Sequence, residues 1–290
     1  MTSGSLGPDD LILSHFVLGR HRDFVERVSA AAAAGFRGIG MYVKEYERLR
    51  ADGWTDADLR AVLAEHDLSV VELEVLRGWS GPDVAGYREA EAAVFAMADA
   101  LAGPAGPPHH VQAIGPYDGS LDDAAEAMAA VCRRAAAHGL MVAIEFFPEM
   151  SNITDAGVAW EIAERSGQPN AGVNIDIWHH ERGANDVELL RAIPADRVFA
   201  VQVSDGPATR TESDYYADTT RNRVPLGEGD FDVTGFLRIL DDMGVRVPLS
   251  VEVLSAAYAA MPAAEVTRHL AETTRAAMAS ARADREKDLA

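Results

Sequence analysis

Short hydrophobic runs alternate with longer amphipathic segments along the whole chain. Eight runs have the length of a β-strand, and most are rich in the strand-forming residues Val and Ile. These runs cover residues 11–16, 36–43, 68–76, 109–114, 140–147, 171–178, 198–203 and 247–254. Apolar residues recur at helical spacing in the segments that follow them. The predicted helices cover residues 23–34, 55–66, 83–101, 120–138, 154–166, 187–193, 232–243 and 264–281.

Local signals mark the ends of several predicted helices. Glycine stands just past four of them, where a left-handed residue commonly ends a helix, at Gly35, Gly139, Gly167 and Gly244. Thr55 is followed three residues later by Asp58, which predicts a weak capping box at the start of the second helix.

Strict alternation of strands and helices predicts parallel strands joined by crossover helices. Two α/β arrangements fit this pattern, an open doubly wound sheet and a closed (β/α)₈ TIM barrel. Eight units in a chain of 290 residues favour a single-domain barrel. A nucleotide-binding open sheet would require a phosphate loop, and neither GxGxxG nor GxxxxGK[ST] follows any of the eight runs.

One domain is therefore expected over residues 1–290, with an N-terminal extension at 1–10 and a polar C-terminal tail at 282–290. Two connections are longer than simple loops. Residues 103–108 (GPAGPP) predict a rigid hinge before the fourth strand. Residues 205–230 form a long excursion, and long ordered loops often carry function.

Composition and charge narrow the classes of partner. The chain is 48% hydrophobic and 25% charged, as in ordinary globular proteins. Its formal charge of −20 argues against nucleic-acid and membrane partners, because both surfaces attract basic patches. The single cysteine, Cys132, cannot form an internal disulfide. With no targeting segment or apolar stretch of about 18 residues, these features predict a cytoplasmic protein.

Four polar residues interrupt the late part of four consecutive strands, where barrel enzymes place their chemistry. They are Glu145, Asp176, Gln202 and Glu252. Buried carboxylates are costly, and three that converge repel one another unless a divalent cation offsets both effects. Three carboxylates and an amide oxygen suit Mn²⁺ or Mg²⁺. The alternative is that one or two of these acids pair with arginine at the barrel rim.

Basic residues that can contact a substrate lie near these acids. His179 follows Asp176 by three residues and is expected at the barrel mouth, where it contacts a substrate hydroxyl or holds a ligand; the alternative is a solvated loop histidine. Arg182 can meet an anionic or carbonyl group. Arg221 and Arg223 can clamp a carboxylate or phosphate, unless they belong to a solvated surface turn.

Earlier parts of the chain add weaker candidates for substrate contact. Glu74 lies late in the third strand, on the same face as Glu72, and His15 lies near the end of the first strand. Trp178 can wall a sugar-sized pocket, although tryptophan in a core is common. Glu228 can lock its loop by accepting a hydrogen bond.

Five motifs together resemble the xylose isomerase-like TIM-barrel family. They are AIEFF with Glu145, NIDIWHHERG with Asp176 and His179, VQVSD with Gln202, RVPLGEGDFD, and VEV with Glu252. The family includes sugar-phosphate isomerases and epimerases, inosose dehydratases and isomerases, and 3-dehydroshikimate dehydratases. The resemblance implies that the four oxygen donors bind one Mn²⁺-type ion, that Glu145 and Glu252 exchange the substrate proton, and that His179 touches the substrate.

The chain departs from the ketose 3-epimerases in two places. Gln202 stands where they carry histidine, and at this position the 3-dehydroshikimate dehydratases resemble the chain better. Ala208 stands where they carry an arginine, and Arg210, Arg221 or Arg223 can substitute for it.

The resemblance and the residues together predict a metal-dependent isomerase or epimerase of a keto-sugar or cyclitol-type polyol, acting through an enediolate. The same chemistry supports two other outcomes, dehydration of the 3-dehydroshikimate or inosose type and cleavage of a C-glycoside. A non-catalytic sugar-binding barrel is a further alternative. The expected cofactor is one divalent cation, Mn²⁺ first, with Mg²⁺, Co²⁺ or Zn²⁺ as alternatives, and the resemblance also implies a homo-oligomer.

Overall fold

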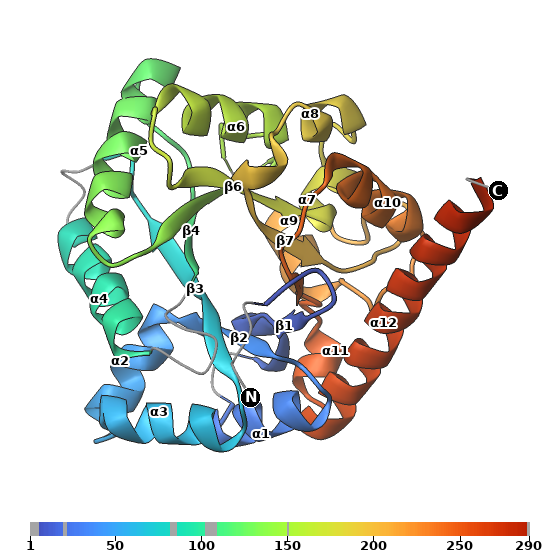
Figure 1. Ribbon diagram of the computed structural model, residues 1–290, viewed down its shortest axis with the longest axis horizontal. Helices are drawn as coiled ribbons and strands as arrows, with labels where there is room; N and C mark the ends of the chain where they lie inside the picture. The colour runs from blue at the N-terminus through green and yellow to red at the C-terminus, as the bar shows by residue number, and fades with distance from the viewer. Residues whose placement is uncertain (1–5, 20–21, 82–85, 102–108, 150, 289–290) are drawn as a thin grey trace.

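Eight parallel strands close into a barrel in the computed structural model, which describes residues 6–19, 22–81, 86–101, 109–149 and 151–288 (Figure 1). Each strand pairs with the next one along the chain, and β8 closes the barrel by pairing with β1. The strands are β1 (Leu11–Leu13), β2 (Gly38–Tyr42), β3 (Ser69–Arg77), β4 (His110–Ile114), β5 (Met141–Glu145), β6 (Ala171–Asp176), β7 (Val198–Val203) and β8 (Leu249–Val251). The predicted fold class is confirmed.

The longer helices surround the barrel on its outer side (Figure 1), and shorter helices lie at the carboxyl end of its strands. They are α1 (Phe24–Ala33), α2 (Val43–Ala51), α3 (Asp56–Glu65), α4 (Tyr87–Ala100), α5 (Leu121–Ala136), α6 (Ala156–Arg165), α7 (Ile177–Arg182), α8 (Val187–Arg191), α9 (Tyr215–Arg221), α10 (Val233–Met243), α11 (Ala256–Ala259) and α12 (Ala263–Asp288). Two short 3₁₀ helices are η1 (His15–Leu18) and η2 (Ala195–Arg197). Among the described residues, no helix is long and apolar enough to cross a membrane.

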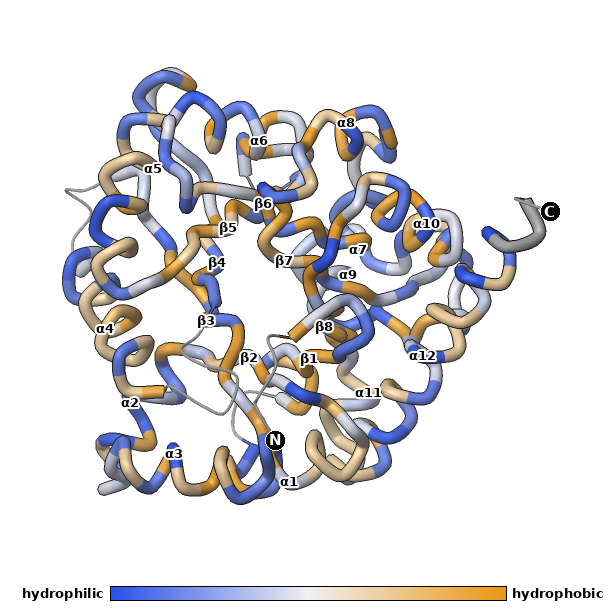
Figure 2. Tube along the Cα trace, in the orientation of Figure 1, coloured by the Kyte–Doolittle hydropathy of each residue, from blue (hydrophilic) through white to orange (hydrophobic). Residues whose placement is uncertain are grey.

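The hydrophobic core lies between the strands and the helices that cover them. Val, Ile and Leu side chains of the strands are almost fully buried, and those of α1, α5 and α12 pack against them. Figure 2 shows this arrangement as hydrophobic colour on the strands and alternating colour along the helices. Parallel strands buried on both faces form continuous apolar runs, which explains why they were recognisable in the sequence.

Helix ends follow the predicted signals. Thr55 and Asp58 form a reciprocal capping box at the start of α3. Gly139 has a φ of 70°, and Gly244 a φ of 82°, so each adopts the left-handed conformation that glycine takes without steric cost. Local chemistry and the barrel therefore favour the same boundaries.

The sequence analysis missed four helices, α2, α7, α9 and α11. Residues 36–43 were expected to be one strand, but the chain leaves β2 at Tyr42 and begins α2 at once. The run expected to be a strand to residue 178 ends at Asp176, whose side chain caps α7. Within the long excursion, Asp214 caps α9 through the amide of Ala217. In each case the helix is short, and its periodicity is too brief to detect.

The ends of the chain also differ from expectation. The last helix continues beyond residue 281, so α12 incorporates residues 282–288 that were expected to form a polar tail. The first strand is shorter than the predicted run 11–16, because η1 begins at His15. The predicted hinge at 103–108 lies outside the described residues.

Candidate active site and metal centre

A cavity of about 260 Å³ opens at the carboxyl end of the barrel. The strands β3, β4 and β5 form one part of its wall, and the segments from α7, α9, α11 and η1 form the rest. The side chains of Glu145, His179, Arg223 and Glu252 all line it. Parallel strands end here with their last side chains exposed to the loops, which is where barrel enzymes hold their substrates.

Glu145 and Asp176 lie at the ends of neighbouring strands, β5 and β6. Asp176 divides its two oxygens between different partners. Its Oδ1 accepts the amide of Trp178 at 2.9 Å and so begins α7, whereas Oδ2 faces the site. The first turn of α7 then returns His179 over the carboxylate, because residues three apart share a helix face. The strand-to-helix junction thus builds the site locally.

His179 brings an imidazole nitrogen to both acids. Its Nε2 lies 3.4 Å from Glu145 Oε1 and 3.4 Å from Asp176 Oδ2. Its Nδ1 lies 2.6 Å from the hydroxyl of Tyr215. Burial lowers the pKa of His179 to about 3, so the ring is neutral. If Tyr215 accepts the proton on Nδ1, the lone pair of Nε2 faces two carboxylates, which is the arrangement of a metal-binding histidine.

The donor set fits a divalent cation. Ligand atoms of Glu145, Asp176 and His179 all lie within 4.8 Å of one another. The Nε2 atom of His179 is buried and has no hydrogen-bond partner among the described residues. A cation would satisfy this atom and offset the repulsion between the two carboxylates. These three residues can therefore hold a metal ion.

Glu252 and Gln202 lie beside this set and are bound to each other. Gln202 donates from Nε2 to Glu252 Oε1 at 3.0 Å, and its Oε1 accepts from Asn174 at 2.5 Å. Ser14 also donates to Glu252 Oε1, at 2.9 Å. The four predicted ligands thus reach one end of the barrel, with the amide of Gln202 held by protein partners.

Arg223 is the buried counter-charge of the site. Its Nη1 lies 2.8 Å from Asp176 Oδ2 and 3.1 Å from Glu252 Oε2. The rest of the guanidinium donates to the carbonyl and hydroxyl oxygens of Thr219. Burial opposes the charge, but Asp176 and Glu252 outweigh it and raise the pKa of Arg223. The expected alternative, an arginine paired with the acids, therefore occurs here beside the candidate metal ligands.

The carboxylates are strongly perturbed. Burial, followed by the charge of Asp176, raises the pKa of Glu145 to about 8, although Arg223 and Arg77 oppose this shift. Burial also raises the pKa of Glu252 well above its ordinary value. A bound cation would displace these protons, because metal ligands bind as carboxylates. Strong pKa shifts within a cavity are typical of functional sites.

The loop after β7 positions Arg223. Asp205 and Val224 exchange two backbone hydrogen bonds of 2.9 Å. The side chain of Asp205 accepts the amides of Gly206, Gly227 and Phe231 and so closes the loop. Gly229 is required because a Cβ there would lie 2.3 Å from Asp205 Oδ1.

Glu228 anchors the outer end of the same loop. Its Oε1 lies 2.7 Å from Nε2 of His269 on α12. Both side chains remain partly exposed, so this contact contributes at most about 1 kcal/mol. The contact joins the loop to α12, and the loop-locking role of Glu228 stays a prediction.

A family model described as xylose isomerase-like TIM barrel matches residues 28–277. The chain belongs to this family. The resemblance drawn from the motifs is therefore confirmed, and the site described above lies entirely within the matched segment.

Curated relatives in the family are enzymes of two classes. A 3-dehydroshikimate dehydratase from Pseudomonas aeruginosa is 27% identical over 253 residues, covering 82% of this chain and 37% of the relative. An inosose isomerase from Halalkalibacterium halodurans is 30% identical over 141 residues, covering 47% of this chain and 48% of the relative. The chain thus spans less than half the length of these relatives.

Solved structures show the same fold. The IolI protein with a bound zinc atom has a TM-score of 0.81 and 17% identity, covering 92% of this chain and 97% of the other. At this identity the likeness concerns the fold. The zinc atom belongs to that protein. In this chain, Glu145, Asp176 and His179 form the candidate metal site.

Several predicted substrate-binding residues of this family member do not line the cavity. Arg182 stacks on Trp178 and Phe231 and donates to the carbonyl of Pro207, with Asp218 3.3 Å from its Nε. Arg182 therefore organises the loop, and Trp178 is fully buried beneath it. Arg221 is exposed and borders a different, shallow pocket.

Two others lie deeper in the barrel. Glu74 Oε1 accepts the backbone amide of His15 at 2.9 Å, and both side chains are fully buried. Burial, together with neighbouring Glu72 and Glu252, raises the pKa of Glu74 well above its ordinary value. Neither side chain lines the cavity. The substrate contact predicted for them would therefore require the barrel interior around them to rearrange.

Sequence reasoning missed residues that the fold brings to the site. Asn174 precedes Asp176 by two residues and shares its strand face, so alternation alone could have identified it. Gln112 interrupts the hydrophobic run of β4 in the same way. Arg77 lies at the last position of β3, and Tyr215 lies in the excursion, where no local pattern pointed to them.

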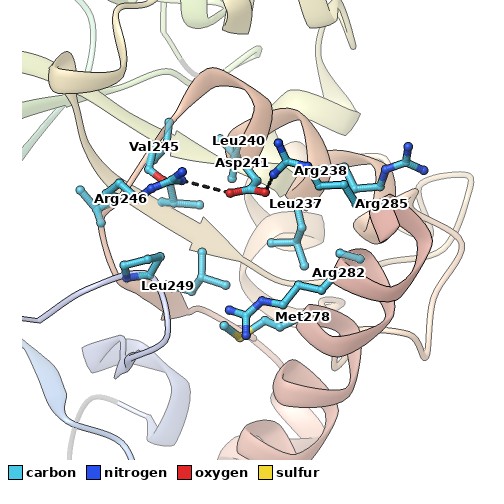
Figure 3. Close-up of a pocket in the computed structure, with 14 residues that line it drawn as sticks. Leu237, Arg238, Leu240, Asp241, Val245, Arg246, Leu249, Met278, Arg282 and Arg285 are labelled. Carbon is cyan, nitrogen blue, oxygen red and sulfur yellow. Dashed lines mark hydrogen bonds and ion pairs between the residues drawn. The ribbon is translucent and has the colours of Figure 1, made fainter. Parts of the chain in front are cut away.

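Further pockets lie at the opposite end of the barrel. One of about 100 Å³ is bordered by α10 and α12, with Leu237, Leu249 and Met278 on its apolar floor (Figure 3). Its arginines are engaged: Arg246 and Arg285 both pair with Asp241. Another, of about 270 Å³, is lined by residues that include Glu72 and His110. This end of a barrel serves stability rather than catalysis.

Proposed function

We propose that this chain is a divalent-metal-dependent isomerase or epimerase that moves a proton next to the carbonyl of a keto-sugar or cyclitol-type polyol. The main support is that ligand atoms of Glu145, Asp176 and His179 all lie within 4.8 Å of one another. Glu252 lines the same cavity and offers a second glutamate. The match to an inosose isomerase supports this reaction class.

The proposed ligands are Glu145, Asp176, Gln202 and Glu252, and the position of His179 adds a nitrogen donor to this set. Mn²⁺ is the proposed ion, because oxygen donors predominate. When bound, a divalent cation polarises the substrate carbonyl and stabilises the negative charge that develops on the substrate oxygens. For Gln202 to offer its oxygen, the hydrogen bond from Asn174 must be shared or exchanged.

The two glutamates exchange the proton in this account. Glu145 lies at the end of β5 and Glu252 directly after β8, so a substrate between them is accessible from two sides. One carboxylate removes the proton, and the other returns it at the opposite face or at the neighbouring carbon. Ser14, Gln202 and Arg223 hold the carboxylate of Glu252 in place. A bound cation would favour the charged form of Glu145, so this carboxylate would be deprotonated and able to accept the substrate proton.

Dehydration is the second candidate. The 3-dehydroshikimate dehydratase match extends over 82% of this chain, which is a larger share than the inosose isomerase match covers. The first step is the same removal of a proton next to a ketone. A hydroxyl group β to the ketone then leaves, so only one glutamate needs to act as a base.

A substrate screen tests the proposal. The purified protein with added Mn²⁺ is incubated in D₂O with ketoses, inososes and 3-dehydroshikimate, and each mixture is followed by NMR. Rearranged product with deuterium at the carbon next to the carbonyl supports isomerisation or epimerisation, whereas an alkene product supports dehydration. Absence of exchange and product with every compound, from protein that binds the metal, would contradict both candidates.

We further propose a cytoplasmic protein, on the basis of its single cysteine, and a homo-oligomer, on the basis of the family resemblance. Sedimentation of the purified protein tests its assembly. A species heavier than the 31.1 kDa chain is expected, and a single 31.1 kDa species would contradict it.

A further inference from the structure

The cavity of about 270 Å³ at the amino-terminal end of the barrel is separate from the candidate active site. No described residue lines both cavities. Its volume far exceeds the roughly 10–15 Å³ that one water molecule needs. His109 and Arg246 border it and are exposed to solvent. This cavity can therefore admit a small organic molecule.

Glu72 and His110 bring unpartnered polar atoms to this cavity. They are paired in register on the neighbouring strands β3 and β4, and both line the cavity. Glu72 is 0% exposed and His110 is 2% exposed. The Oε2 atom of Glu72 and both ring nitrogens of His110 have no hydrogen-bond partner among the described residues. Buried polar atoms without partners are costly, so a ligand that bonds to them would be stabilised.

The carboxylate of Glu72 lacks a counter-charge in the described part of the chain. Its Oε1 accepts the hydroxyl of Ser250 at 2.6 Å, which is a neutral donor. Burial lowers the pKa of His110 to about 3, so this ring is neutral as well. Arg246 borders the cavity but pairs with Asp241 at 3.0 Å (Figure 3). A buried carboxylate in this setting favours a cationic ligand.

The spacing of the two side chains suits an ammonium group. Glu72 Oε2 and His110 Nε2 lie 3.7 Å apart. One ammonium nitrogen about 2.8 Å from each atom can donate to both, because a neutral imidazole has one acceptor nitrogen and an ammonium group has several donors. A protein-bound zinc ion requires at least three protein ligands, and among the described residues such a cluster occurs at Glu145, Asp176 and His179.

The rest of the wall is suited to hydrocarbon. Ile12, Phe199, Val201 and Val247 line the same cavity. We propose that this cavity binds a small organic ammonium compound, with its charged group at Glu72 and His110 and its hydrocarbon part against the apolar wall. The inference does not depend on the proposed reaction. A ligand bound here would stabilise the folded barrel.

Two probes of similar size test this assignment. Butylammonium and butanol share a hydrocarbon chain and differ in the charged group. Titrations of the isotope-labelled protein, followed by NMR at pH 8, give both dissociation constants. Burial raises the pKa of Glu72 to about 7, so its carboxylate is ionised at this pH, while an alkylammonium ion remains charged. We expect butylammonium to bind at least about 10-fold more tightly, because its hydrogen bonds are charge-assisted.

Variants locate the bound ammonium group. Glu72→Gln keeps an oxygen that can accept from Ser250 and removes the charge, so it should abolish the preference and leave butanol binding unchanged. His110→Leu removes the second acceptor and should weaken butylammonium binding. The matched control is Glu145→Gln, the same substitution in the other cavity, which should retain the preference.

Four outcomes would overturn the proposal. Binding of neither probe would show that the cavity takes no such molecule. Equal binding of the two probes by the native protein would remove the cation site. A preference retained in Glu72→Gln would exclude Glu72 as the counter-charge. A preference lost in Glu145→Gln would assign the ammonium ion to the candidate active site.

Discussion

The guanidinium of Arg223 lies 2.8 Å from the Oδ2 atom of Asp176, the same oxygen that faces Nε2 of His179. One carboxylate oxygen therefore serves a permanent cation and lies within the candidate metal site. Both side chains are fully buried, so water screens this ion pair little. Arg223 reduces the repulsion among the acids before any metal binds.

Replacing Arg223 should destabilise the metal-free protein. In Arg223→Gln, Asp176 and Glu252 lose their shared counter-charge, and breaking such a buried pair costs about 3–5 kcal/mol. Urea unfolding of the metal-free variant measures this cost. Added Mn²⁺ should restore part of the lost stability, because a ligand that binds the folded state stabilises that state. Native-like stability without metal would contradict this role.

Metal content tests the candidate ligands individually. Asp176→Ala removes a central carboxylate, so metal should fall below one ion per chain while the fold, followed by circular dichroism, persists. The matched control is Glu126→Gln, at an exposed acid on α5, which should retain its metal. Stoichiometric metal in Asp176→Ala would remove Asp176 from the ligand set.

The hydroxyl of Tyr215 should strengthen metal binding through its hydrogen bond with His179. Tyr215→Phe removes the partner of Nδ1, and loss of such an orienting hydrogen bond typically lowers metal affinity about 10–100-fold. Titration with Mn²⁺ gives the affinity of the native protein and the variant. If His179 only contacts substrate, which is one of the two roles that the sequence analysis gave it, the two affinities will agree and substrate binding alone will weaken.

Glu72 should make stability depend on pH. Burial raises the pKa of Glu72 to about 7, while Ser250 donates to its Oε1 at 2.6 Å. Between pH 4.5 and 7 the folded state holds a proton that the unfolded state releases, so stability falls as pH rises through this range. Glu72→Gln imitates the protonated acid. The unfolding free energy of this variant minus that of the native protein should therefore increase by about 3 kcal/mol from pH 4.5 to pH 8. A difference that is constant with pH would contradict the raised pKa.

The sequence predicted the barrel and the acids well, because both leave periodic signals. A carboxylate inside a Val-rich run is conspicuous, and Glu145 and Asp176 were recognised for this reason. Which arginine reaches the site was not predictable. Arg221 and Arg223 have similar neighbours in sequence, and the choice depends on the non-local bridge between Asp205 and Val224.

Other site features depend on three-dimensional context in the same way. Tyr215 reaches His179 only because the excursion folds a helix over the barrel mouth. Arg182 was expected at the substrate, but its flat guanidinium packs between aromatic rings, a contact made with Phe231 almost fifty residues away. Local motifs identify the chemical groups, whereas the loops decide which of them face the cavity.

The central claim is that Glu145 and Glu252 move a proton next to a substrate carbonyl. The most direct measurement compares Glu145→Gln and Glu252→Gln with the native protein, all loaded with Mn²⁺, for product formation and for deuterium uptake from D₂O into the substrate. Each variant should retain much of its metal and lose turnover by at least about 10²-fold, as expected for loss of a general base. If one variant still exchanges the proton without forming product, the remaining glutamate is the first base. Near-normal turnover in both variants would show that the two carboxylates do not transfer the proton.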